Sequence, residues 1–219
     1  RDDGDETGQA RAFLAGHSLG GTQAAIFAAL HPERVQGLAL LGTPLHFGPM
    51  VGDLDRLVAT SPPAQAVTLT LGNVPGSFLN LASAWASPKT YEFDRWQDWF
   101  DSLRDAWAVQ THVRVERWML DESPLARRFF EEVMEQLYRR DLLLRGELLV
   151  GGRRAGPDLV EAPLLNVVDA QCRAVPPEAV IPFHEAAKSP DKRLLWYARD
   201  VGVALYHVGM LVGRSAHER

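Results

Sequence analysis

Apolar and polar positions along this 219-residue chain change pattern from one region to the next. Near the start, a short apolar run at residues 12–15 precedes a glycine-lined turn, and residues 22–30 are rich in helix formers and stop before Pro32. A near-continuous apolar run at 35–41 then ends at Gly42, which is typical of a parallel strand buried on both faces. Strand, helix and strand within roughly thirty residues predict a βαβ unit with a right-handed crossover.

The middle of the chain, from about residue 48 to 145, lacks this alternation and has helical periodicity instead. One predicted helix carries its large apolar side chains on a single face: Trp96, Trp99, Phe100, Leu103 and Trp107. Ser123–Pro124 predicts the start of another helix, with Phe130 and Val133 among its inward residues. Apolar strand patterns resume at 162–168 and 193–197, after a turn at Gly151–Arg154. We therefore predict a helical insertion between two parts of an α/β sheet.

The segment Gly16–Gly21 carries the most specific chemical signal in the chain. It reads Gly-x-Ser-x-Gly, and a strand, this turn and a helix together form a nucleophile elbow that lifts the Ser18 hydroxyl above a sheet. The backbone N–H of Leu19 would then stabilise the oxyanion that forms during acyl transfer, whereas the side chain of His17 should point away from the nucleophile. The alternative interpretation is a glycine-rich turn with a solvated serine.

A nucleophilic serine needs a histidine base and an acid that orients the histidine. In this type of site the acid follows the serine along the chain, and the histidine comes last. His207 comes after the last predicted strand, two residues before Gly209, which permits a loop or a close approach, so we predict it as the general base. The alternative is a buried histidine with a purely structural role. Asp169 directly follows the strand at 162–168 and is the predicted acid, although a solvated turn aspartate fits equally well. Asp200 is a reserve candidate, whereas Asp158 and Glu161 precede the strand and should lie at its wrong end.

Composition narrows the class of protein and its surroundings. Hydrophobic residues make up 46% of the chain, as in ordinary globular proteins, and the net charge of −5 argues against a nucleic-acid partner. A single cysteine, Cys172, excludes an internal disulfide and fits a reducing compartment. The acidic first ten residues do not resemble a signal peptide, and no stretch is long enough to cross a membrane. We expect a cytoplasmic protein with no transmembrane segment, no metal and no cofactor.

Tryptophan is concentrated in the helical insertion, where five of the six lie between Trp85 and Trp118. Such a segment is what a lid over a hydrophobic substrate would contain. The alternative is that these rings build the core of the insertion itself.

The predicted fold is an α/β-hydrolase type, a mostly parallel sheet with an inserted helical lid. Residues 1–47 would form the first part of the core with the elbow, 48–150 the lid and 151–219 the second part of the core. In that fold the nucleophile strand lies mid-sheet, so further strands and the loop with a second oxyanion donor should precede it. Only a polar decapeptide and Arg11 do, so either the N-terminal strands are missing from this sequence or the fold is a truncated variant; we expect a fragment.

Several segments together resemble the polyhydroxyalkanoate synthases, enzymes that polymerise 3-hydroxyacyl-CoA thioesters. They are the elbow continued by Leu30–Val35, then Gly72–Gly76, Val115–Trp118, Asp121–Pro124, Leu144–Leu148, Val175–Pro177 and His207–Gly209. The resemblance runs from about residue 12 to the C-terminus and includes the lid. It implies a hydroxyacyl-CoA or polyester substrate under an aromatic lid, and association with granules or with other subunits.

Two departures from that family affect the expected reaction. The family has a cysteine where this chain has Ser18, and a serine ester passes to water more readily than to another acceptor. The family acid lies three residues before Val-Pro-Pro, where this chain has Cys172, so the role is expected to move to Asp169. The first hypothesis is a synthase-like acyltransferase; the alternatives are a serine esterase or polyhydroxyalkanoate depolymerase, and a non-catalytic relative that binds granules or subunits.

Overall fold

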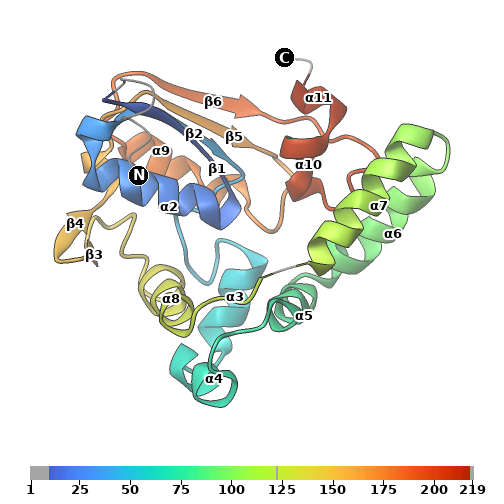
Figure 1. Cartoon of the computed structure of the whole chain (residues 1–219), viewed down its shortest axis with the longest axis horizontal. Helices are drawn as coiled ribbons and strands as arrows, with labels where there is room; N and C mark the ends of the chain where they lie inside the picture. Colours follow the sequence, from blue (N-terminus) through green and yellow to red (C-terminus); the bar gives the residue numbers. More distant parts are fainter. Residues whose placement is uncertain (1–9, 122, 218–219) are drawn as a thin grey trace.

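The computed structural model describes residues 10–121 and 123–217. The polar residues 1–9, on which the expectations about the N-terminus partly rest, and Glu122 lie outside the described residues. Figure 1 shows a small sheet with its helices at one end of the molecule and a group of helices below and beside it.

The main sheet has four parallel strands in the order β1-β2-β5-β6. Their bounds are β1 Ala12–His17, β2 Val35–Leu41, β5 Leu164–Val168 and β6 Lys192–Trp196. The predicted βαβ unit is therefore present, and the strands predicted at 162–168 and 193–197 are confirmed within two residues.

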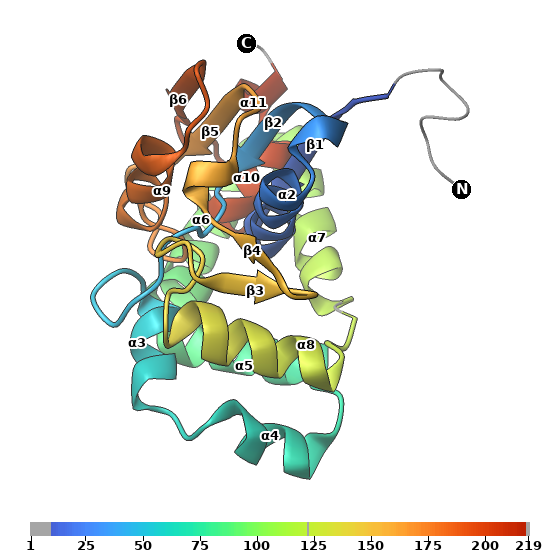
Figure 2. The same ribbon diagram turned by 90° about the vertical axis from the view of Figure 1, so that its left-hand side faces the viewer.

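Two helices, α2 (Ser18–Leu30) and α9 (Ile181–Ala186), lie under one face of the sheet, and the turn at Pro157–Leu159 contacts both (Figures 1 and 2). The strand residues that point to this face are buried, such as Leu40 and Leu164. On the opposite face, Leu41 and Val167 are only half-buried. The expectation that the 35–41 strand is buried on both faces is therefore wrong for the described residues, because the covering helices lie on one face.

The helical region contains eight helical segments among the described residues. They are α3 Asp53–Thr60, α4 Ala64–Leu71, α5 Gly76–Ala86, η2 Lys89–Phe93, α6 Asp94–Ser102, α7 Ala106–Leu120, α8 Arg127–Glu132 and η3 Val133–Tyr138. The helix predicted from Ser123–Pro124 begins at Arg127 instead, because the backbone of Leu125 first pairs with Val74 in an isolated bridge. We call residues 53–138 the lid, since they form the helical insertion that the sequence predicts. The predicted domain boundaries at 48 and 150 stay an interpretation.

The chain returns to the sheet through a hairpin of β3 (Leu148–Val150) and β4 (Arg153–Ala155), with its turn at Gly151–Gly152 as predicted. Short 3-10 turns lie between α2 and β2 (η1 Pro32–Arg34) and after the hairpin (η4 Pro157–Leu159 and η5 Pro177–Ala179). The last helices are α10 Tyr206–Val212 and α11 Arg214–His217. None of the helices in the described ranges has the length and apolar content to span a membrane.

Candidate active site

Ser18 stands at the point where β1 ends and α2 begins, at the carboxyl edge of the sheet. Its φ is +52°, a left-handed backbone conformation that residues other than glycine rarely adopt. This value marks a sharp, strained turn. The turn is possible because Gly16 and Gly21 approach closely: a Cβ on Gly16 would lie 2.5 Å from the Gly21 Cα. The geometry is that of the predicted elbow, and Leu19, in the first turn of α2, lies beside Ser18 in the same cavity wall.

His207 comes from the other end of the chain and lies in the same cavity wall as Ser18. It is the second residue of α10, directly after a loop that ends at Leu205. Of the two roles predicted for the nearby glycine, the close approach is the one present, because a Cβ on Gly209 would lie 2.7 Å from the Tyr197 hydroxyl. The ring is buried, and its Nε2 has no hydrogen-bond partner among the described residues. Burial, followed by the nearby His17, lowers the pKa of His207 to about 3, so the ring is neutral at pH 7 and its Nε2 is available to accept a proton.

His17 is not among the residues that line the cavity beside Ser18, but its ring contacts His207 directly. Its Nε2 lies 3.0 Å from the backbone oxygen of His207, and the two ring centroids are 4.4 Å apart. Burial lowers the pKa of His17 as well. The motif Gly-x-Ser-x-Gly leaves the residue before the serine open, so only the fold brings this ring onto His207.

The other ring nitrogen of His207 faces a thiol. Its Nδ1 lies 3.8 Å from the Sγ of Cys172, which also accepts the backbone N–H of Val175 at 3.4 Å. Burial raises the pKa of the Cys172 thiol, so the group at Nδ1 is neutral at pH 7.

Asp169 is buried at the carboxyl end of β5, as predicted, but its carboxylate faces other groups. One oxygen accepts the N–H of Gln171 at 2.8 Å and the other accepts Nε of Arg199 at 2.8 Å. The guanidinium of Arg199 in turn lies 4.3 Å from the ring centre of Tyr206. The structure thus gathers Ser18, His207 and Cys172, and holds Asp169 next to them in an ion pair with Arg199. The reserve candidate Asp200 accepts the Tyr197 hydroxyl at 2.6 Å.

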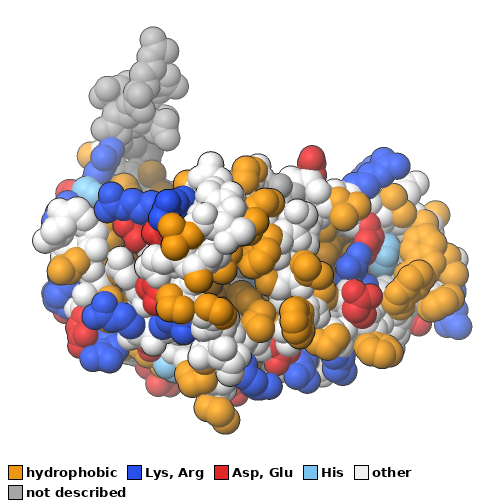
Figure 3. All heavy atoms as spheres, turned by 90° about the horizontal axis from the view of Figure 1, so that it is seen from below, with side chains coloured by type: hydrophobic (Ala, Val, Ile, Leu, Met, Phe, Trp, Pro, Cys, Tyr) orange, Lys and Arg blue, Asp and Glu red, His pale blue; other side chains and the backbone are white. Residues whose placement is uncertain are grey.

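Ser18 and His207 open onto a cavity of about 620 Å³ that runs into the lid. Its walls are mostly apolar and come from α3, α4, α5, α8 and η3; they include Leu57, Val67, Phe78, Ala82, Trp85, Phe130 and Met134. A volume of this size lies within the range of about 300–1,000 Å³ that is usual for small-molecule sites. Figure 3 shows hydrophobic side chains gathered over this side of the molecule.

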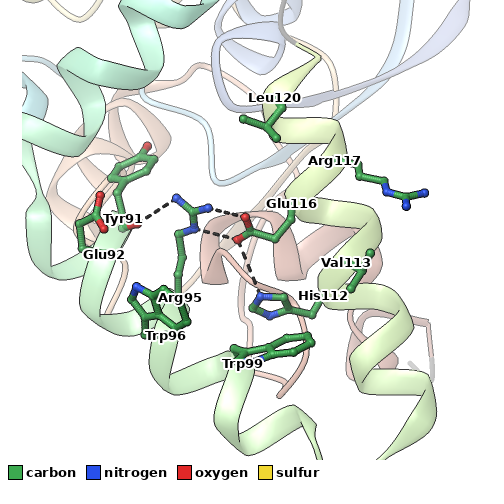
Figure 4. A pocket seen from close by; sticks show the side chains of 10 residues that line it. All are labelled: Tyr91, Glu92, Arg95, Trp96, Trp99, His112, Val113, Glu116, Arg117 and Leu120. Carbon is green, nitrogen blue, oxygen red and sulfur yellow. Dashed lines mark hydrogen bonds and ion pairs between the residues drawn. The ribbon is translucent and has the colours of Figure 1, made fainter.

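The lid tryptophans lie in different places: some line one of two pockets, and some are largely exposed. Trp85 lines the large cavity, although 77% of it is exposed. Trp96 and Trp99 line a second pocket of about 520 Å³ between α6 and α7, drawn in Figure 4. Trp96 and Trp118 are 62% and 58% exposed, so neither of them fits the alternative that the rings only build the core of the lid.

Residues 4–84 match the family model described as the alpha/beta hydrolase fold. The chain has the α/β-hydrolase fold. Among solved structures, a monoacylglycerol lipase from Paleococcus ferrophilus aligns over 88% of this chain and 60% of its own, with 20% identity and a TM-score of 0.52. An enol-lactonase from Burkholderia xenovorans aligns over 98% and 65%, with 17% identity and a TM-score of 0.52. At these identities the likeness concerns the fold alone.

Sequence similarity points to one group of proteins that have this fold. The poly(3-hydroxyalkanoate) polymerase subunit PhaC of Haloferax mediterranei is 30% identical over 97% of this α/β-hydrolase-fold chain and 42% of its own length. The PhaC subunits of Haloarcula marismortui and Allochromatium vinosum are each 27% identical, over 97% and 94% of the chain. The chain is related to the PhaC subunits, as the resemblance of its motifs predicts. It spans about half the length of these curated relatives, from 42% to 56%.

Proposed function

We propose that this chain carries the acyl-transfer centre of a polyhydroxyalkanoate synthase-like enzyme that acts on 3-hydroxyacyl-CoA. The observation that carries the proposal is Ser18, strained at φ +52° at a sheet edge, in one cavity with the unpartnered Nε2 of His207. The similarity to the PhaC subunits supports the class of substrate.

In the proposed reaction, the Ser18 oxygen attacks the thioester carbonyl while His207 Nε2 takes its proton. The backbone N–H of Leu19 donates to the oxyanion. The C–S bond breaks and the CoA sulfur leaves with the proton from His207, so the acyl group remains as a Ser18 ester. The hydroxyl of a growing polyester, or water, then attacks this ester and regenerates Ser18.

Asp169 stays the predicted acid that orients His207. It has the right place at the end of β5, and it reaches Nδ1 only if it exchanges its ion pair with Arg199 for the imidazole. An Asp169→Asn variant with unchanged activity would contradict this role.

Ser18 itself favours a second candidate, a serine esterase or depolymerase acting on similar acyl groups, because a serine ester is readily hydrolysed. Incubation of the full chain with 3-hydroxybutyryl-CoA separates the two. The synthase proposal expects CoA release matched by polymer; CoA release with free acid and no polymer would contradict it and support the hydrolase.

An exposed aromatic face on the lid favours a third candidate, a non-catalytic relative that binds granules or subunits. Phe93, Trp96, Phe100 and Leu103 follow one another at helical spacing and are each more than half exposed. Labelling with a fluorophosphonate tests this candidate, with Ser123→Ala as the control because Ser123 lines the same cavity. Labelling of the full chain and of Ser123→Ala, but not of Ser18→Ala, would contradict a non-catalytic role. Equal labelling of Ser18→Ala, or none in any form, would overturn the proposed nucleophile.

A further inference from the structure

The helical hairpin of α6 and α7 buries a carboxylate against the segment that leads to His207. Asp98, on α6, is 1% exposed, and its neighbour His112, on α7, is also buried. The segment that it meets runs from the end of β6 to the start of α10, which carries His207.

Asp98 has three hydrogen-bond partners: two join the lid to this segment, and the third joins α6 to α7 within the lid. The backbone N–H of Gly202 donates to Oδ1 at 2.8 Å, and that of Ala204 donates to Oδ2 at 2.7 Å. The Nδ1 of His112 lies 2.7 Å from Oδ2. Hydrogen bonds to a charged acceptor are the strong ones, so this carboxylate fixes two of the five backbone positions before His207.

The segment has little freedom to move on its own. A Cβ on Gly202 would lie 2.5 Å from the Cα of Ala108 on α7, so the two backbones are in close contact. Ala204 has φ +55°, a conformation that an alanine holds only where the surroundings impose it. Leu205 and Val208 pack against Val115 of α7.

A second layer of charges supports His112 from the pocket between α6 and α7 (Figure 4). Glu116 binds the guanidinium of Arg95 through both of its oxygens, and one of these oxygens is 3.8 Å from His112 Nε2. The chain of contacts therefore runs from Arg95 through Glu116 and His112 to Asp98 and the backbone before His207.

We propose that Asp98 is a positioning residue that holds His207 in register with Ser18, so that the α6–α7 hairpin of the lid governs the catalytic base. This inference rests on the proposed roles of Ser18 and His207. Asp98 touches neither of them and acts only through the backbone at 202–204. A tilt of the hairpin would move this backbone and with it the imidazole.

The test compares Asp98→Asn with Asp101→Asn, an exposed aspartate on the same helix. An asparagine at 98 keeps the size but presents a donor where three donors converge. We expect kcat for ester hydrolysis to fall roughly 10- to 100-fold with KM nearly unchanged, because displacement of a catalytic group by about 1 Å has effects of this size. Asp101→Asn should retain wild-type kinetics. His112→Asn, whose amide nitrogen can replace Nδ1, should retain more activity than His112→Leu.

A double-mutant cycle separates positioning from a general structural role. In a His207→Ala background, Asp98→Asn should cause no further loss of the residual rate, because the group that it positions is gone. An equal loss in both backgrounds, or wild-type kcat in Asp98→Asn, would overturn the proposal.

Hydrogen–deuterium exchange distinguishes a failure of this inference from a failure of the proposed function. Faster exchange at residues 198–207 in Asp98→Asn, but not in Asp101→Asn, is the expected result and does not depend on catalysis. If the wild-type chain lacks Ser18 labelling, the proposed function fails. The exchange result still tests whether Asp98 holds the backbone at 202–204. Unchanged exchange at 198–207 would overturn the proposed positioning role of Asp98 even if the enzyme is active.

Discussion

The Nδ1 of His207 is the position where individual residues matter most in this site. A catalytic imidazole becomes a cation while it holds the serine proton, and a carboxylate at Nδ1 stabilises that cation. Here Nδ1 faces the neutral thiol of Cys172, while Asp169 is paired with Arg199. The low pKa of His207 follows from this environment, in which burial disfavours the charged ring. As a base the ring is available, but it is poorly stabilised after it accepts the proton.

Replacing Cys172 by aspartate should therefore raise activity. A carboxylate within reach of Nδ1 stabilises the imidazolium, and we expect kcat/KM to increase by roughly tenfold or more. The same charge raises the pKa of His207 from about 3 toward the ordinary histidine value. Because the base must be neutral, the acid limb of the kcat/KM–pH profile should move to higher pH. The measurement is that profile for a soluble ester, recorded between about pH 4 and 8.

Cys172→Ser is the matched control, since it is small and neutral and should leave the acid limb in place. If Cys172→Asp gave neither a gain nor a shift while Asp169→Asn lost activity, Asp169 would already supply the carboxylate in the native enzyme.

The sequence was sufficient to predict Ser18, Leu19 and His207 as candidates. Ser18 and Leu19 lie within one contiguous motif, and His207 follows from the order of the catalytic groups along the chain. The contact between the His17 and His207 rings could not be predicted, because it depends on how α10 lies relative to the end of β1. The Cys172 contact was accessible only through the family resemblance: no local rule places residue 172 at an imidazole thirty-five positions later.

At the scale of elements, the packing of α2 against the loop that follows β2 depends on Gly21. A Cβ at this position would collide with the side chain of Thr43, whose hydroxyl, methyl and Cβ are the nearest atoms. Gly21→Ala should therefore lower the free energy of unfolding by about 1–3 kcal/mol, the usual cost of overpacking. The measurement is urea denaturation.

Gly20→Ala is the control, because a Cβ at this position would meet nothing within 4 Å and Gly20 is an exposed residue of the same helix. It should be neutral or stabilise by up to about 1 kcal/mol, since alanine has the higher helix propensity. Thr43→Ala should restore part of the loss in Gly21→Ala. Equal effects of the two glycine substitutions would show that the collision is relieved at no cost.

Helix α6 shows what periodicity can and cannot predict about an element. The apolar spacing correctly predicts a helix at residues 96–100, but α6 ends at Ser102 and Trp107 belongs to α7, so the single helix expected through Trp107 is wrong. The buried residues of α6 are Asp98 and Ser102, and its apolar face is largely exposed. The buried side of α6 carries polar groups because it meets a backbone segment whose N–H groups need acceptors. Hydrogen-bond acceptors were needed inside, and periodicity carries no information about such a partner.

For the molecule as a whole, the proposed function requires that the cavity between the sheet edge and the lid hold the acyl group. The apolar walls from five helical segments enclose about 620 Å³ next to Ser18, far more than a four-carbon acyl group needs. The sequence predicted a lid over a hydrophobic substrate. It could not predict the size of the cavity, which is set by how helices distant in sequence pack together.

We therefore expect kcat/KM for p-nitrophenyl esters to rise with acyl length from four to about twelve carbons. Each methylene that leaves water contributes up to about 0.8 kcal/mol, or roughly fourfold in rate. Ala82→Trp places a large ring into the cavity wall and should remove the gain for long chains while the four-carbon ester reacts as before. Ser77→Trp adds the same ring at an exposed position of α5 and should keep the wild-type profile. A profile that is flat in the wild-type chain, or unchanged in Ala82→Trp, would mean that the acyl chain does not occupy this cavity.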